Sequence, residues 1–170
     1  MPYEQIPKRY APDAIHLIRT TQQLQVQLSA MADQKASILM GAAFVVFSLT
    51  INQAAQRNAS PAMMVLAAFS LVAAVLAVLA ILPAVKPKKD APLNLLFFGS
   101  FTQLDQEDYI ERVVGKLKDE EDIYRTMARD IYQNGAVLQR KKYKFLALAY
   151  RVFLAGLLVT VGVFAGGQLA

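Results

Sequence analysis

Residues 36–56 read ASILMGAAFVVFSLTINQAAQ and contain no Asp, Glu, Lys or Arg. Two further runs, residues 58–85 and 152–170, also lack these four residue types. A helix needs about 20 predominantly apolar residues to cross the hydrocarbon core of a bilayer. The sequence therefore predicts three transmembrane helices, which we place at residues 36–56, 62–85 and 145–168.

A water-soluble helical bundle is the alternative for a chain that is 55% hydrophobic. Helices that are apolar on all sides need a large protein shell, and the rest of a 170-residue chain is too small to supply one. A signal peptide does not fit the first run, because about 35 mostly polar and amphipathic residues precede it. The chain has no cysteine and one histidine, His16, which excludes disulfides and a histidine metal cluster.

The positive charges predict how the chain is oriented. Seventeen of the 18 lysines and arginines lie before the first run or between the second and the third, and only Arg57 lies between the first two. Lysine and arginine are retained on the cytoplasmic side of membrane proteins. We therefore expect a cytoplasmic N-terminus and middle segment, with the C-terminus outside.

Apolar residues recur every seven positions before and within the first run. One series is Leu17, Leu24, Met31, Ile38 and Val45, and its companion is Ala14, Thr21, Leu28, Lys35, Ala42 and Leu49. Such a repeat is typical of helices that pack along a partner helix. Because it passes the start of the uncharged run unbroken, we predict one helix from about residue 13 to residue 56.

The last third of the chain carries a second repeat of this kind. Its members are Tyr124, Ile131, Leu138, Phe145 and Val152, and they predict a continuous helix from about Glu120 to near the C-terminus. Gly162 and Gly166, four residues apart, add a small-residue signal for close packing of membrane helices.

The predicted fold is an all-α membrane protein with three transmembrane helices, the first and third of which extend into a cytoplasmic helical stalk. The stalk helix occupies residues 13–35, after an irregular arm at 1–12. An external turn is expected at 57–61, and a cytoplasmic helical region at 86–144. Within that region residues 94–99 form a short apolar segment, and Asp105 precedes a helix whose buried stripe would be Tyr109, Ile110, Val113, Val114 and Leu117.

One cluster of polar residues suggests a ligand site. Arg125, Arg129, Asp130, Tyr132 and Asn134 lie within three helical turns. Arginines can hold an anion, and an aromatic or amide group can contact a ring. The alternative is a solvated helix face with a Glu121–Arg125 pair four residues apart.

A second polar group lies where the long helices are predicted to enter the membrane. It comprises Asp33, Lys35, Lys141, Lys142 and Lys144. Attraction to anionic lipid headgroups is the simple interpretation of the later lysines. Lys35 falls within the seven-residue repeat, and Asp33 is its nearest acid in the sequence.

Several segments resemble the transmembrane effectors of Pycsar antiphage systems. They are residues 32–39 (ADQKASIL), residues 128–138 (ARDIYQNGAVL) and residues 141–143 (KKY). Within them Asp33, Lys35, Arg129, Asp130, Asn134, Gly135 and Lys141 match the family pattern.

The resemblance implies a bacterial immune effector of the inner membrane. A partner cyclase would make cyclic UMP or cyclic CMP during phage infection, and the effector would then impair the membrane, so that the infected cell stops growing or dies. We expect a homo-oligomer without catalytic residues, cofactor, metal or nucleic-acid partner. The alternative is a non-enzymatic membrane scaffold whose coiled-coil stalk recruits a cytoplasmic partner.

Overall fold

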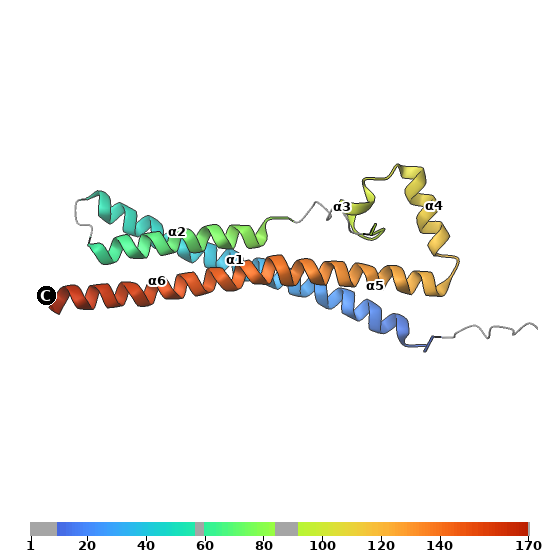
Figure 1. The fold of residues 1–170 in the computed structure, drawn as a ribbon, viewed down its shortest axis with the longest axis horizontal. Helices are drawn as coiled ribbons and strands as arrows, with labels where there is room; N and C mark the ends of the chain where they lie inside the picture. The colour runs from blue at the N-terminus through green and yellow to red at the C-terminus, as the bar shows by residue number, and fades with distance from the viewer. Residues whose placement is uncertain (1–9, 57–59, 84–91, 170) are drawn as a thin grey trace, which may run out of the picture. The chain divides into compact units, whose positions relative to one another are not determined.

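The computed structural model describes residues 10–56, 60–83 and 92–169, and every regular element in these ranges is helical (Figure 1). The elements are α1 (Ala14–Ala55), α2 (Pro61–Ile81), α3 (Phe98–Phe101), α4 (Gln106–Lys116), α5 (Glu120–Val137), the π-helix η1 (Leu138–Tyr143) and α6 (Lys144–Leu169). The predictions for residues 1–9, for residues 57–59 and for Lys86, Lys88 and Lys89 lie outside the described residues.

Three helical segments are long and apolar enough to cross a membrane. They are α1, α2 and the uninterrupted run of α5, η1 and α6, with mean hydropathies of 1.7, 2.8 and 2.0 in their most apolar parts. Both α1 and the last run begin well before their uncharged stretches. The predicted all-α class, with the first and third spans extended as helices, is therefore confirmed.

The second span begins with a well-formed helix cap. Ser60 has extended backbone geometry, and its side chain accepts a hydrogen bond from the backbone N–H of Met63 at 3.3 Å. Pro61 follows at the first helical position, where its missing N–H costs no hydrogen bond. These two residues explain why the helix starts where the sequence predicts it.

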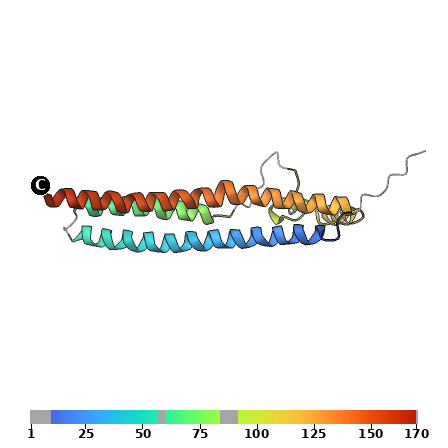
Figure 2. The same ribbon diagram turned by 90° about the horizontal axis from the view of Figure 1, so that it is seen from below.

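The chain divides into two compact units, and the first to consider comprises residues 27–84 and 135–170. Its core consists mainly of alanine: Ala32, Ala36, Ala80 and Leu146 form one cluster, and Leu39, Ala77 and Ala149 form the next. Small side chains allow helices to approach closely. Helix α2 lies beside α6 (Figure 2), and the order of the paired residues makes the two antiparallel.

Helices α2 and α6 approach each other closely at a glycine. A Cβ atom placed on Gly156 would lie 2.3 Å from the Cβ of Phe69. No described atom lies within 4 Å of a Cβ placed on Gly162 or Gly166. The predicted glycine pair is thus not the contact that packs α6 within this chain.

A π-helix precedes α6 and changes which of its residues face the core. The fully buried positions in α6 are Leu146, Ala149 and Gly156, one to four residues after the positions Phe145 and Val152 of the seven-residue repeat, which are only partly buried. A π-helical turn holds more residues than an α-helical turn because its hydrogen bonds join residues five apart. The predicted continuous helix from Glu120 onward is therefore present, and the seven-residue repeat gave no sign of its π-helical segment.

The second unit comprises residues 10–26 and 92–134 among the described residues. In it α1 contacts α5: the side-chain amide of Gln25 donates to the backbone carbonyl of Ile131 at 3.0 Å, and that of Gln22 donates to the Asp130 carboxylate at 3.1 Å. Before α1, the ring of Tyr10 packs edge to face on that of Tyr124, with ring centroids 4.7 Å apart. The expected side-by-side packing of the two stalk extensions is therefore present in this unit.

Helix α4 differs from the prediction. Of its expected buried stripe, Ile110, Val114 and Leu117 are exposed, and no residue of the helix is fully buried. Within its apolar stripe Tyr109 stacks on Phe101 of α3, whereas Ile110, Val114 and Leu117 stay exposed. Periodicity identified the apolar face correctly but could not show what covers it.

Candidate anion-binding site

The site is built around Asn94, which is 2% exposed. Its backbone N–H donates to the Ser100 hydroxyl at 3.0 Å, and its side-chain oxygen accepts from the N–H of Leu96 at 2.9 Å. Asparagine favours turns because its side chain can bond to the backbone two residues later. The apolar segment 94–99 is therefore a closed turn that leads into α3.

Helix α4 is fixed against this turn by one aromatic residue. The Tyr109 ring stacks on Phe101 with ring centroids 4.7 Å apart, and its hydroxyl donates to the Leu95 carbonyl at 3.4 Å. Residues three and seven positions later lie on the same side of a helix. Tyr109 thereby places Arg112 and Lys116 beside residues 93–95.

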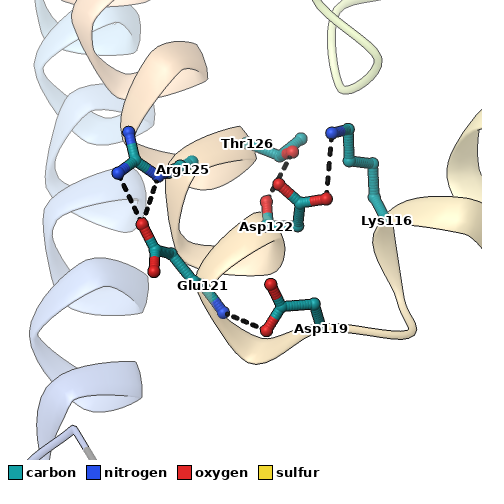
Figure 3. Close-up of polar contacts among 6 residues, drawn as sticks. All are labelled: Lys116, Asp119, Glu121, Asp122, Arg125 and Thr126. Atoms are coloured by element: carbon teal, nitrogen blue, oxygen red, sulfur yellow. Dashed lines mark hydrogen bonds and ion pairs between the residues drawn. The ribbon is translucent and has the colours of Figure 1, made fainter. Parts of the chain in front are cut away.

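The end of α4 is joined to the start of α5 by a small polar network (Figure 3). The Lys116 ammonium lies 3.0 Å from the Asp122 carboxylate. The Thr126 hydroxyl donates to the Asp122 carbonyl at 2.8 Å, and the Asp119 side chain accepts from the N–H of Glu121 at 3.2 Å. This network aligns the cationic face of α4 with Arg129 on α5.

These elements enclose a cleft of about 170 Å³, which we call the basic cleft. Its lining residues are Leu93, Asn94, Leu95, Arg112, Lys116, Thr126 and Arg129. Among the described residues Asp122 pairs with Lys116, whereas no described carboxylate pairs with Arg112 or Arg129. Two arginines without counter-charges are well suited to a phosphate or carboxylate group, to which guanidinium groups donate paired hydrogen bonds.

The structure separates the five residues predicted as a ligand site. Arg129 lines the basic cleft. Arg125 does not; its Nε donates to Glu121 at 2.7 Å, and this hydrogen bond raises the pKa of the guanidinium above its ordinary value. For Arg125 the structure thus has the Glu121–Arg125 pair that the sequence offered as the alternative to a ligand contact. Tyr132 is exposed on α5.

Asp130 and Asn134 belong to a hydrogen-bond network whose buried members are Asp130 and Asn94. Asp130 is 7% exposed and accepts from the side-chain amides of Gln22 at 3.1 Å, Asn94 at 3.0 Å and Asn134 at 2.9 Å. Hydrogen bonds from three amides stabilise the carboxylate in place of water. The network connects α1, the turn at Asn94 and α5, and so holds one wall of the basic cleft.

The five residues predicted at the membrane face lie on α1, on η1 and at the start of α6. Lys142, not Lys35, is the partner of Asp33: its Nζ lies 2.6 and 2.8 Å from the two carboxylate oxygens and 2.7 Å from the Ser29 hydroxyl. Side chains two apart on a helix do not face each other, so Asp33 cannot pair with Lys35.

Lys35 and Lys141 each take part in a contact that involves a backbone carbonyl, and neither forms an ion pair with a described carboxylate. The backbone carbonyl of Lys35 lies 3.4 Å from the Tyr150 hydroxyl, and Lys141 lies 3.5 Å from the Pro83 carbonyl. Gly135 lies within α5 and is partly buried. None of these residues lines the basic cleft, and they belong to the other compact unit.

Sequence reasoning missed the other four polar residues of the cleft, Asn94, Arg112, Lys116 and Thr126. One signal was available, since Arg112 and Lys116 are two cations four residues apart on a predicted helix. Nothing in the sequence showed that this helix would face Arg129. Among the described residues no group of three or more His, Asp or Glu side chains is placed to hold a metal ion.

Comparison with known proteins identifies one family. The model of the Pycsar effector protein domain matches residues 16–167, which is nearly the whole chain. Neither the curated proteins nor the solved structures contain a match to the chain. The match includes α1, α2, the basic cleft and nearly all of α6. The chain therefore belongs to the Pycsar effector family, and its role is that of an antiphage effector.

Proposed function

We propose that this effector is activated by a cyclic pyrimidine mononucleotide, cyclic UMP or cyclic CMP, made by a partner cyclase, and that it then impairs the bacterial inner membrane. The nucleotide binds in the basic cleft on the cytoplasmic side. The observation that carries this proposal is that Arg112 and Arg129, from two different helices, line one cleft without a described carboxylate partner.

The chemistry of the cleft matches the phosphate of a cyclic nucleotide. A cyclic phosphodiester carries one negative charge, and two guanidinium groups can each donate to its oxygens. The cleft volume of about 170 Å³ is below the roughly 300 Å³ typical of pockets that enclose a whole ligand. The phosphate and sugar therefore occupy the cleft, and the base lies at its open side, against Leu93 or Leu95.

The proposed topology gives the ligand access to this site. With 17 of 18 cationic residues on the same side, the positive-inside rule places the N-terminus and the cleft in the cytoplasm, where the cyclase releases its product. Signal binding would then act on helices that continue into the predicted spans. Several copies are expected to act together, since one set of three spans is too few to line a pore.

The proposal is tested with three arginine variants. Arg112→Ala and Arg129→Ala each remove a proposed phosphate contact, and Arg125→Ala removes an arginine of the same helical region that is paired with Glu121. A hydrogen bond to a charged group contributes about 1.5–3 kcal/mol, so each cleft variant should weaken binding by roughly tenfold or more. Binding is measured by isothermal titration calorimetry of the purified full chain with each cyclic nucleotide.

Depolarisation of cells that co-express a cyclic-pyrimidine cyclase provides the second readout. Arg112→Ala and Arg129→Ala should abolish it, and Arg125→Ala should leave it unchanged. The reverse ranking would move the site to the exposed face of α5 that carries Arg125 and Tyr132. If neither nucleotide produces heat with the unaltered protein, the ligand proposal is wrong.

One observation favours the alternative, a scaffold that recruits a cytoplasmic partner. Ile110, Val114 and Leu117 form an exposed apolar stripe on α4, and such stripes are common at helix-binding surfaces. A scaffold predicts that Val114→Asp abolishes protection from phage while nucleotide binding is absent in the unaltered protein. If the chain is a nucleotide-activated effector, the unaltered protein and Val114→Asp should both bind nucleotide.

A further inference from the structure

Helix α1 presents two different faces in the unit of residues 27–84 and 135–170. One face contains Ala32, Ala36, Leu39 and Ala43, which are buried against the chain's own helices. The adjacent face, which we call the α1 seam, consists of Leu28, Met31, Ile38, Val45 and Leu49, each between 40% and 63% exposed. The chain's own packing therefore leaves the seam uncovered.

The spacing of the seam identifies what kind of partner covers it. Met31, Ile38 and Val45 are seven residues apart, and Leu17 and Leu24 continue the series toward the N-terminus. A residue repeated every seven positions drifts by about 20° per repeat around a straight helix. Such a repeat stays in contact only with another helix that winds around it. Contact with lipid requires no repeat of this kind.

The seam also crosses from a charged to an uncharged part of the helix. Leu28 and Met31 precede Asp33 and Lys35, whereas Ile38, Val45 and Leu49 lie inside the uncharged run 36–56. A partner helix must therefore pass from water into lipid at the same level. A second copy of α1 in parallel orientation meets this requirement by symmetry.

We propose that the α1 seam packs against the same seam of a second copy of this chain, in parallel and in register. The flanking residues Gln27, Gln34 and Gly41 are uncharged, so like charges do not face each other along the edges of the seam. Lys35 lies between the seam residues Leu28 and Leu49 in the companion series of the repeat, and a single polar residue at such a position fixes the register of paired helices at some cost in stability. This inference rests on the proposed function, in which several copies of the chain act together.

The absence of cysteine from the chain allows a direct test by single-cysteine cross-linking. Ile38→Cys lies in the seam, and Phe44→Cys lies outside it; both native side chains are 63% exposed, so chance collisions affect them equally. A disulfide requires Cβ atoms about 3.5–4.5 Å apart. The full-length variants are oxidised in native membranes with copper phenanthroline and separated on a non-reducing gel.

The proposal predicts that Ile38→Cys gives a cross-linked dimer band and that Phe44→Cys gives none. Met31→Cys and Ala30→Cys form a second matched pair on the charged side of the boundary, with the same expected ranking. Val45→Cys replaces Ile38→Cys if that variant does not accumulate in the membrane. Equal cross-linking of seam and non-seam positions, or cross-linking at Phe44 and Ala30 alone, would overturn the proposal.

A parallel measurement separates this inference from the proposed function. Nucleotide binding by the same cysteine variants is measured by calorimetry under reducing conditions. If the variants bind nucleotide but the seam positions do not cross-link, the proposed seam interface is wrong and the proposed nucleotide site stands. If the seam positions cross-link but no nucleotide binds, the seam interface stands and the proposed activation by a cyclic nucleotide is wrong.

Discussion

The contact between Gly156 and Phe69 supports a quantitative prediction about how α2 and α6 pack. In Gly156→Ala the new methyl carbon would lie 2.3 Å from the Phe69 Cβ and 2.8 Å from its Cγ, whereas carbon atoms in contact are about 3.5–4.0 Å apart. Rotation of the Phe69 side chain cannot move its own Cβ. The two helices must therefore separate by more than about 1 Å.

The free-energy cost follows from two opposing effects. Added methyl groups in a packed interior destabilise by about 1–3 kcal/mol. Replacing glycine by alanine in a helix favours the helix by about 0.8–1.0 kcal/mol. Gly162→Ala gains the second effect alone, because no described atom lies within 4 Å of its new Cβ. Comparing the two variants isolates the cost of the clash.

The measurement is the free energy of unfolding of each full-length variant in detergent micelles, from denaturant titrations followed by circular dichroism. Gly156→Ala should be less stable than Gly162→Ala by about 1–3 kcal/mol. The loss should extend to the neighbouring contacts of Ala77 with Ala149, since the helices move apart as a pair. Equal stability of the two variants would refute the close antiparallel contact.

The remaining predictions concern buried polar groups. Asp130→Asn should destabilise the chain by about 1.5–3 kcal/mol, because an amide N–H₂ would face the amide groups that donate to Asp130; thermal unfolding without a change would make the network irrelevant to stability. Ser70→Ala should stabilise by about 1 kcal/mol, because the buried Ser70 hydroxyl has no partner among the described residues, and a lower unfolding midpoint would contradict this. Lys142→Met should destabilise by about 1–3 kcal/mol by leaving Asp33 unpaired, and adding Asp33→Asn should recover part of the loss in a double-mutant cycle.

The helical architecture was largely predictable because its signals are local. Runs without charge identified the spans; α2 begins at Pro61, one residue before the predicted second span, and ends at Ile81, four residues before its predicted end. The start of α1 at Ala14 agrees with the expected position to one residue. The π-helix η1 was not predictable, since a single additional residue in a turn leaves no mark on apolar spacing averaged over several heptads.

The candidate site was predictable only in part because it depends on contacts between distant segments. Arg129 was identified from its own helix. Its partners Arg112 and Asn94 come from earlier segments, and contacts between distant residues bring them to it: Lys116 with Asp122, and Asn94 with Asp130. The surroundings of Asp130 were not predictable for the same reason, since its carboxylate accepts hydrogen bonds from Gln22 on α1 and from Asn94 in the turn before α3.

The π-helix at residues 138–143 has a consequence for how the chain length can vary. Hydrogen bonds that join residues five apart make room for one residue beyond the α-helical number. Deleting one residue there converts the wide turn to an ordinary α-helical turn, and the backbone ladder stays closed on both sides. Homologues that are shorter by a single amino acid in this third span are expected to carry the gap at this turn.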